Sequence, residues 1–599
     1  MKKFTKIDIM QIREKIIKNS YIIFLLTAIF WSIAIVGRGI DMSDMGYSIS
    51  KYKYAFENSS SMSISMFLST MFGGLIYNII PSHHLLVFKL LNVAVVGVCI
   101  LLTFYMFKDL INKNLLAFML MIVSFLKSGT YSIMTYTSIS MLFLMLAAFF
   151  VYKRIKSEKY IYPFLTGLTI GLSFLFRFPN ILFALLYVVI LWNDIINDKK
   201  EHIIKDTLSM FFGGLIGLVL PLATAAAYIG FDGILNSIGG LTKTATSTTD
   251  NHGIIQMIIN IFRQAISGVR VHIFYCALTS VFLVALIIIF IIKKRNDKKL
   301  FTGVTYTLLC CTAILSSLIT LFKYNHYNTT TLILAVFSIP IEIFSIFYFM
   351  KKEKIVSLLS LMSICIAVTV SIGTDNGIFQ HLYVIYWLFP CFCYVTYKLC
   401  KDIYVKIKNT KKIPTILCFI LATLLVLSIN TAANVSINSV CMLSGVQYRE
   451  QKYSSLNYQP DSKELYGVKT NDGHGLVLDG VKEFLSDSKY SEKTVLALND
   501  IPMIFTVIDN KNFLGDTFWV DLRSVPEEKL EKSLDLCEKE TDMPIVVIRY
   551  LNYDDTPFIK SRKVMMVESF CEKNNYIEAK SENLNGEKLY SIFIPQDVK

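Results

Sequence analysis

The sequence predicts an α-helical membrane protein that crosses the bilayer many times and carries a soluble α/β domain at its C-terminus. Hydrophobic residues make up 54% of the 599 positions and charged residues only 17%, a more apolar composition than that of an ordinary soluble protein. Uncharged runs of about 20 residues, the length that a helix needs to cross the hydrocarbon core, recur along the chain. From residue 445 onward, polar residues and short β-like runs replace the apolar ones.

Apolar length and flanking charge predict about thirteen spans. The first is interpreted as a retained span, because it lacks the small-residue cleavage site of a signal peptide. The fifth and sixth are joined only by RFPN, so a broken or re-entrant hairpin is the alternative there. The predicted spans cover approximately residues 19–38, 84–107, 114–130, 136–152, 160–177, 179–194, 207–229, 270–292, 300–322, 329–350, 355–373, 382–399 and 413–430.

The net charge of +14 is concentrated in short loops between apolar runs, which favours membrane topology over nucleic-acid binding as its explanation. Basic loops mark the cytoplasmic side of a bilayer, and with thirteen spans all of these loops fall on one side. The sequence therefore predicts a multi-pass protein of the cell membrane with a cytoplasmic N-terminus (1–18), a membrane domain (19–430) and an extracytoplasmic domain (431–599). The basic segments are the N-terminus and residues 153–159, 293–299, 351–354 and 408–412.

Two outer loops, 39–83 and 230–269, contain apolar stretches that predict helices lying along the membrane surface. In the C-terminal domain, the β-like runs TVLALN, PIVVIRY and KLYSIFI alternate with helix-like stretches, which indicates a small α/β domain. Most of the twelve cysteines lie in apolar runs and show no metal-binding spacing, so no metal site is predicted. Motifs such as a Walker A loop, G-x-S-x-G and H-E-x-x-H are absent from the sequence.

The first outer loop opens with two acids in the segment RGIDMSDMGY, Asp41 and Asp44. One interpretation is a solvated exit loop, since loops are usually polar surface. The other is a general base, because a carboxylate beside a membrane surface can take a proton from an attacking hydroxyl group.

The order of these elements resembles that of the C-type (GT-C) glycosyltransferase superfamily, which includes protein O-mannosyltransferases and aminoarabinose transferases. The shared features are a first span, an outer loop that opens on an acid as in SDMGY, surface helices, many further spans and an outer soluble domain. Members carry an Asp-Glu or similar acidic motif there, and they take a sugar from a polyprenyl-phosphate donor. By position, the resemblance assigns the base to Asp44, which begins D-x-G-Y, with Asp41 in support. The sequence departs from the family motif in that Met45, not an acid, follows Asp44.

The resemblance implies an inverting transfer, in which an acceptor hydroxyl group attacks the anomeric carbon as the lipid phosphate leaves. Inversion places the base on the face opposite the leaving group, and cations must stabilise the charge that grows on the phosphate. The cations on the predicted outer side include Lys51, Lys53, Lys89, Arg177, Lys323 and His326. Arg177 is either a snorkelling side chain or a phosphate contact, and FRFPN resembles an element of bacterial superfamily members.

The outer ends of other spans supply the remaining candidates. Asp375 and Asn376 of SIGTDNGI, and the segment TYTS at 135–138, either form ordinary turns or contact substrate. His83 and His84 lack further ligands for a metal. The predicted substrate-binding residues are Tyr47, Lys89, Arg177, Lys323, His326, Asp375 and Asn376.

The expected partners are a polyprenyl-phosphate-linked sugar, membrane lipids and an extracytoplasmic glycan, lipid or protein acceptor. No cofactor is predicted with certainty, and a requirement for Mg²⁺ or Mn²⁺ stays open. Two alternatives to the glycosyltransferase are a flippase for lipid-linked oligosaccharide and a membrane-anchored binding protein. A transporter would need polar groups at mid-span, whereas here they gather near the outer ends of the spans.

Overall fold

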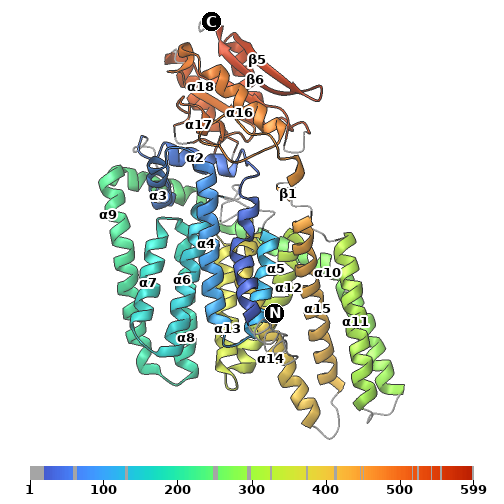
Figure 1. Ribbon diagram of the computed structural model, residues 1–599. Helices are drawn as coiled ribbons and strands as arrows, with labels where there is room; N and C mark the ends of the chain where they lie inside the picture. The colour runs from blue at the N-terminus through green and yellow to red at the C-terminus, as the bar shows by residue number, and fades with distance from the viewer. Residues whose placement is uncertain are drawn as a thin grey trace, which may run out of the picture.

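A computed structural model shows a bundle of long helices with a mixed α/β segment packed on one end (Figure 1). The described residues are 19–57, 64–127, 133–246, 254–292, 298–323, 327–372, 376–409, 415–444, 447–448, 451–515, 517–521, 525–540, 543–552 and 556–596.

Helices make up almost all of the described residues before residue 445. The chain enters the bundle as a helix that tightens into η1 (Trp31–Ile35). The helices that follow are α4 (His84–Phe107), α5 (Lys113–Lys127), α6 (Tyr136–Ser157), α7 (Ile161–Phe174), η5 (Phe178–Leu186), α8 (Tyr187–Ile196), α9 (Lys200–Thr246), α10 (Ile254–Ile292), α11 (Lys298–Lys323), α12 (Tyr327–Phe349), α13 (Lys354–Ser371), η6 (Gly377–Val384), α14 (Ile385–Asn409) and α15 (Thr415–Ser444).

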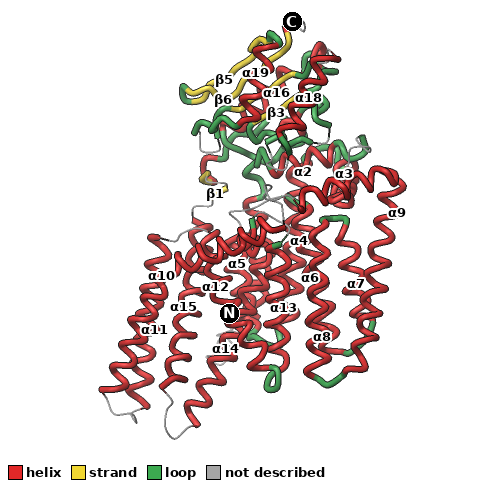
Figure 2. Tube along the Cα trace, turned by 180° about the vertical axis from the view of Figure 1, so that it is seen from behind, coloured by secondary structure: helices red, strands yellow, loops and turns green. Residues whose placement is uncertain are grey.

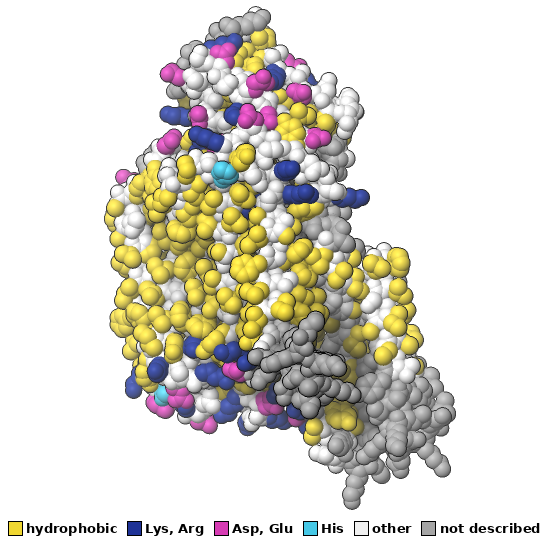
Figure 3. All heavy atoms as spheres, viewed as in Figure 1, with side chains coloured by type: hydrophobic (Ala, Val, Ile, Leu, Met, Phe, Trp, Pro, Cys, Tyr) yellow, Lys and Arg dark blue, Asp and Glu magenta, His cyan; other side chains and the backbone are white. Residues whose placement is uncertain are grey.

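Eight helices among the described residues are long and apolar enough to cross a membrane, and five more apolar helices are shorter. The protein is therefore a multi-pass membrane protein. Each of the predicted spans overlaps one of these helices or α10, but the count of about thirteen stays a prediction. Apolar side chains cover the flank of the bundle, and Lys and Arg gather at the end opposite the α/β segment (Figure 3). Side chains such as Phe211 and Leu220, 60% and 66% exposed, present the apolar surface that lipid requires.

The first predicted surface loop folds into α2 (Asp44–Lys53), η3 (Ile64–Met66) and α3 (Phe67–Ile79), at the end of the bundle that faces the α/β segment (Figures 1 and 2). The second predicted surface helix is not separate, because its residues form the first part of α10. Helix α9 also runs on past its predicted end, and it bends at Gly230, whose φ of 75° only glycine adopts readily.

The C-terminal segment, defined here as the described residues from Gln447 onward, contains a four-stranded sheet in the order β3-β4-β6-β5. Strands β3 (Val495–Leu498) and β4 (Ile545–Arg549) are parallel, whereas β6 (Glu587–Pro595) runs antiparallel to both β4 and β5 (Tyr576–Leu584). The three predicted strand runs correspond to β3, β4 and β6. The helices of the segment are α16 (Asp472–Leu485), α17 (Ile504–Val507), α18 (Glu527–Glu540) and α19 (Arg562–Lys573), and a short β1–β2 pair (Gln447–Tyr448 and Gln451–Lys452) precedes them.

One hydrophobic core joins the C-terminal segment to the helical bundle. Met45 and Ile49 of α2 and Phe88 of α4 are buried together with Ile504 and Phe505 of α17. Backbone hydrogen bonds reinforce the contact, since the Gly39 N–H donates to the Lys469 carbonyl oxygen at 2.8 Å and the Lys469 N–H donates to the Gly37 carbonyl oxygen at 2.9 Å. The C-terminal segment therefore packs directly on the loop that carries the two candidate acids.

Candidate active site

The two acids of the first loop have different surroundings. Asp41 is 3% exposed, and its carboxylate accepts hydrogen bonds from the Ser43 N–H at 3.0 Å, the Ser43 hydroxyl at 2.8 Å and the Met45 N–H at 3.4 Å. These bonds hold the backbone donors at the start of α2, as a capping side chain does. Asp44 is the first residue of α2 and is exposed, so its carboxylate is the one that an external hydroxyl group can approach.

Lys89 supports the same turn from α4. Its ammonium group, buried at 1% exposure, donates to the carbonyl oxygens of Arg38 at 2.7 Å and Gly39 at 2.5 Å, and it interacts electrostatically with Asp41. A buried lysine needs such partners. Lys89 and Asp41 thus fix the backbone that presents Asp44, and the substrate contact predicted for Lys89 stays a prediction.

Close packing fixes the position of α2. A Cβ on Gly46 would lie 2.3 Å from the Met503 nitrogen, and a Cβ on Gly73 of α3 would lie 2.3 Å from the Tyr52 ring. The Tyr52 hydroxyl donates to the Met134 carbonyl oxygen at 3.1 Å. Burial raises the pKa of Tyr52 well above its ordinary value, so this hydroxyl keeps its proton. Helix α2 is therefore held between α3, the C-terminal segment and the residues that precede α6.

Arg177 lies between α7 and η5, in the predicted RFPN connection. Asn180 anchors this connection by donating to the Ser140 hydroxyl and to the Ser173 carbonyl oxygen, both at 2.9 Å. The guanidinium carbon of Arg177 lies 5.7 Å from the ring centroid of Tyr136, the first residue of α6, which is cation–π distance.

Tyr136 connects the acid to the arginine. Asp44, Tyr47 and Arg177 all interact electrostatically with the Tyr136 side chain. The sequence offered Tyr136 only as part of the candidate segment TYTS, and no sequence pattern connects it with Asp44 or Arg177. Residues from α2, α6 and the α7–η5 connection thus form one polar cluster, and this cluster (Asp44, Tyr47, Tyr136 and Arg177) is the candidate active site.

The C-terminal segment borders this cluster. The ring centroids of Tyr47 and Trp519 lie 6.2 Å apart, and the Lys51 ammonium group lies 4.7 Å from the Tyr47 ring centroid. Lys53 links α2 to the C-terminal segment, because it donates to the Ile508 carbonyl oxygen at 2.5 Å and forms an ion pair with Asp509 at 3.1 Å.

The other predicted residues lie elsewhere. Lys323 ends α11, which stands across the bundle from α2 in both views (Figures 1 and 2). Asn376 is exposed and precedes η6, and its carbonyl oxygen accepts a hydrogen bond from Gln264 of α10 at 3.0 Å. His326 and Asp375 lie outside the described residues.

The two histidines of the first loop have local partners. The His84 ring stacks on Tyr77 with centroids 3.9 Å apart, and His83 shares a 2.6 Å hydrogen bond with Ser82. Within the described ranges, no group of three His, Cys, Asp or Glu side chains is arranged to hold a metal ion. A divalent metal requirement stays an open prediction.

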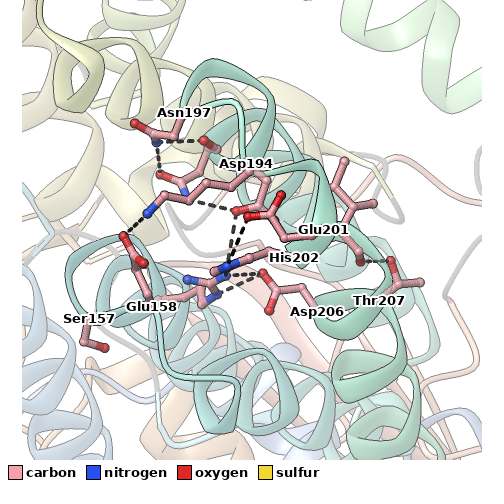
Figure 4. Close-up of polar contacts among 12 residues, drawn as sticks. Ser157, Glu158, Asp194, Asn197, Glu201, His202, Asp206 and Thr207 are labelled. Atoms are coloured by element: carbon pink, nitrogen blue, oxygen red, sulfur yellow. Dashed lines mark hydrogen bonds and ion pairs between the residues drawn. The ribbon is translucent and has the colours of Figure 1, made fainter.

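Figure 4 shows a separate charged cluster where α6 and α8 end and α9 begins. These helix ends lie at the end of the bundle away from the C-terminal segment (Figure 1). Arg154 of α6 is fully buried, and it pairs with Asp206 of α9 at 2.8 Å and with Asp194 of α8 at 3.7 Å. Its guanidinium group also lies 2.9 Å from the His202 ring nitrogen. These ion pairs connect α6, α8 and α9. Arg154 belongs to the basic segment 153–159, from which the sequence predicted a cytoplasmic loop.

Comparison with known proteins relates part of the chain to a family. No curated protein matches the chain. Residues 68–338 match the model of Glycosyltransferase family 87, a range that includes Tyr136 and Arg177 but begins after Asp44. Family 87 is a GT-C-like family of polytopic membrane proteins, and the match to its model indicates glycosyltransferase activity. The chain is therefore similar to glycosyltransferase family 87 over residues 68–338.

Proposed function

We propose that this protein transfers a sugar from a polyprenyl-phosphate donor to an acceptor outside the cell, with inversion at the anomeric carbon and Asp44 as the general base. The observation that carries the proposal is that Asp44 and Arg177, which lie far apart in the sequence, both interact with Tyr136. A transferase of this kind needs an exposed base and a cation within one site, on opposite sides of the reacting carbon.

In the proposed step, the acceptor hydroxyl oxygen forms a bond to the anomeric carbon while the bond from that carbon to the phosphate oxygen breaks. The hydroxyl proton passes to the Asp44 carboxylate. The bonding electrons leave with the lipid phosphate, whose growing negative charge Arg177 stabilises. Tyr136 holds the guanidinium group in place by the cation–π contact.

The topology required by this proposal has the C-terminal segment outside the cell and the N-terminus inside. The support for it is the distribution of basic residues, which gather at the end of the bundle away from that segment (Figure 3). The candidate active site then lies where a polyprenyl phosphate, anchored in the outer leaflet, can present its sugar.

A group of buried polar side chains within the bundle is relevant to the alternative that the protein is a transporter. Buried side chains of α10, α11, α12 and α15 bond one another: Tyr275 to Thr320 at 2.5 Å, Asn434 to Thr320 at 3.4 Å and Asn438 to Thr330 at 2.5 Å. Hydrogen bonds of this kind hold helices together in a membrane. Because these polar groups are paired with each other, they favour a packing role over a transport path.

The donor class can be tested with the purified full-length protein in lipid nanodiscs. It is supplied with a panel of polyprenyl-phosphate sugars or of nucleotide sugars, together with a cell-envelope extract as acceptor. We expect transfer from at least one lipid-phosphate sugar, and NMR of the product should show the anomeric configuration opposite to that of the donor. Transfer from nucleotide sugars alone, or with retention, would overturn the proposal.

A further inference from the structure

The carboxyl ends of the two parallel strands of the C-terminal segment carry a polar cluster that the transfer step does not use. Asn499 and Asp500 follow β3 directly, and the Asn499 side chain donates to the Arg549 carbonyl oxygen at the end of β4, at 2.5 Å. In open α/β sheets, ligands bind beside the carboxyl ends of such strands.

The backbone at this edge adopts a costly conformation. Asn499 and Asp500 have φ values of 66° and 60°, two consecutive non-glycine residues in the left-handed region. Asn and Asp tolerate this region better than other side chains. Residues held in it tend to cluster at functional sites, and here the turn directs the Asp500 backbone N–H toward Asp521.

Two acids and a tryptophan meet at this turn. The Trp519 indole N–H donates to the Asp500 carboxylate at 2.6 Å, and the Asp500 N–H donates to Asp521 Oδ2 at 3.0 Å. The second carboxylate oxygen of Asp521 is buried and accepts no hydrogen bond from any residue within the described ranges. Burial raises the pKa of Asp521 to about 6, and buried carboxylate oxygens of this kind normally have a donor.

Trp519 links this cluster to the candidate active site. Its half-buried ring lies 6.2 Å from that of Tyr47, and Tyr47 follows Asp44 by three residues on α2, which places the two side chains on one face of the helix. The neighbouring Phe518 ring stacks on Tyr54 of α2 with centroids 5.5 Å apart. The position of Trp519 relative to Asp44 is therefore fixed by packing.

We propose that Asp500, Trp519 and Asp521, together with Tyr47, bind the acceptor, and that this acceptor is an uncharged carbohydrate chain. Aromatic rings pack against the apolar faces of sugar rings, and carboxylate oxygens accept hydrogen bonds from sugar hydroxyl groups. Two adjacent carboxylates repel an anionic glycan, whereas the anionic donor is assigned to Arg177, whose guanidinium carbon lies 5.7 Å from the Tyr136 ring centroid. The inference rests on the proposed function for the reaction, but binding can be measured without it.

The test measures the binding of neutral gluco-, manno- and galacto-oligosaccharides, and of a uronic-acid oligosaccharide, to the full-length protein in nanodiscs by isothermal titration calorimetry with no donor present. We expect at least one neutral oligosaccharide to bind. Its affinity should fall tenfold or more in Trp519→Ala and in Asp521→Asn, with partial recovery in Trp519→Phe. Glu531→Gln, an exposed acid of α18, is the matched control and should bind as wild type does.

Thermal unfolding of each variant separates lost binding from lost folding. The inference is overturned if no neutral oligosaccharide binds, if the uronic-acid chain binds more tightly, or if folded Trp519→Ala and Asp521→Asn bind as wild type does. Asp44→Asn distinguishes the two proposals. It should bind the oligosaccharide normally and transfer no sugar, so an active Asp44→Asn variant would remove the proposed base and leave the acceptor site standing.

Discussion

The guanidinium group of Arg177 lies over the ring of Tyr136, with its central carbon 5.7 Å from the ring centroid. Asp44, the first residue of α2, interacts electrostatically with the same tyrosine. The cation follows α7, the ring begins α6 and the acid begins α2. A single side chain thus brings together two elements of the transfer chemistry that the sequence separates by more than a hundred residues.

Replacing Arg177 should impair catalysis more than folding. In Arg177→Ala the growing phosphate charge loses its cation, and we expect kcat to fall by about 10²-fold or more. Arg177→Lys keeps the charge but loses the planar group that stacks on Tyr136, so it should recover only part of the rate. Steady-state transfer assays measure both variants, and Lys323→Ala, across the bundle, serves as control. A rate for Arg177→Ala equal to that of wild type would exclude a role for this arginine in the reaction.

Adding one methyl group to α2 should loosen the C-terminal segment. The Cβ of Gly46→Ala would lie 2.3 Å from the backbone nitrogen of Met503, and backbone cannot yield as a side chain can. We expect a loss of about 1–3 kcal/mol from overpacking, together with faster hydrogen exchange around residues 501–508. Gly233→Ala is the control, since its Cβ would meet only side-chain atoms at 3.4 Å or more. Unchanged exchange in Gly46→Ala would show that this contact does not hold the segment in place.

Helices α7 and α9 offer a matched pair of adjacent glycines. A Cβ on Gly213 would lie 2.0 Å from the Phe164 carbonyl oxygen, whereas a Cβ on Gly214 would lie 3.7 Å from its nearest neighbour. Small residues allow such close approach of helices in membranes. Gly213→Ala should therefore lower the unfolding temperature in nanodiscs, and Gly214→Ala should leave it unchanged or raise it slightly. Equal effects of the two substitutions would contradict this packing.

The buried ion cluster at the other end of the bundle should contribute strongly to stability. Arg154→Ala leaves Asp194 and Asp206 buried without their cation, which we expect to cost about 3–5 kcal/mol. Lys156→Ala, at an exposed position two residues later, should change stability by less than about 0.5 kcal/mol. Denaturant unfolding of the two variants measures the difference, and similar losses would argue against a special role for Arg154.

The sequence predicted the helical elements well because apolar length alone determines where a membrane helix can form. The runs at 84–107 and 355–373, for example, agree with α4 and α13 to within a few residues. Strand β5 was not predicted, although Asn585-Gly586, with φ values of 55° and 88°, supplies the hairpin turn that signals it.

The candidate site was predictable only in part. Loop position and charge singled out Asp44 and Arg177. In the structure Arg177 lies 5.7 Å from the Tyr136 ring centroid, and Asp44 interacts electrostatically with the same tyrosine. Trp519 and Asp521 carry no local signal, because their proximity to α2 depends on packing between segments more than 450 residues apart. Lys323, like Arg177, is a basic residue at the predicted outer end of a span. The positions of spans in the sequence do not show which helices are neighbours in the bundle, so the sequence could not separate the two residues.

Asp521 should make stability depend on pH. Burial raises its pKa in the folded protein to about 6, above the value of about 3.9 for an unfolded aspartate. The folded state therefore binds the proton more tightly, and the stabilisation is complete below about pH 4 and lost as the pH rises through about 6. Asp521→Asn should remove this part of the pH dependence in thermal unfolding between pH 4 and 7. An unchanged profile would contradict a carboxylate with this burial.

The most direct test of the central claim is the transfer rate of Asp44→Asn with a polyprenyl-phosphate sugar that wild type accepts. Asn keeps the shape of the side chain but cannot take the proton, and Glu57→Gln, an exposed acid at the end of the same loop segment, is the control. We predict that Asp44→Asn folds normally and loses transfer by about 10²-fold or more, while Glu57→Gln keeps the wild-type rate. Full transfer by a folded Asp44→Asn variant would contradict the assignment of Asp44 as the base.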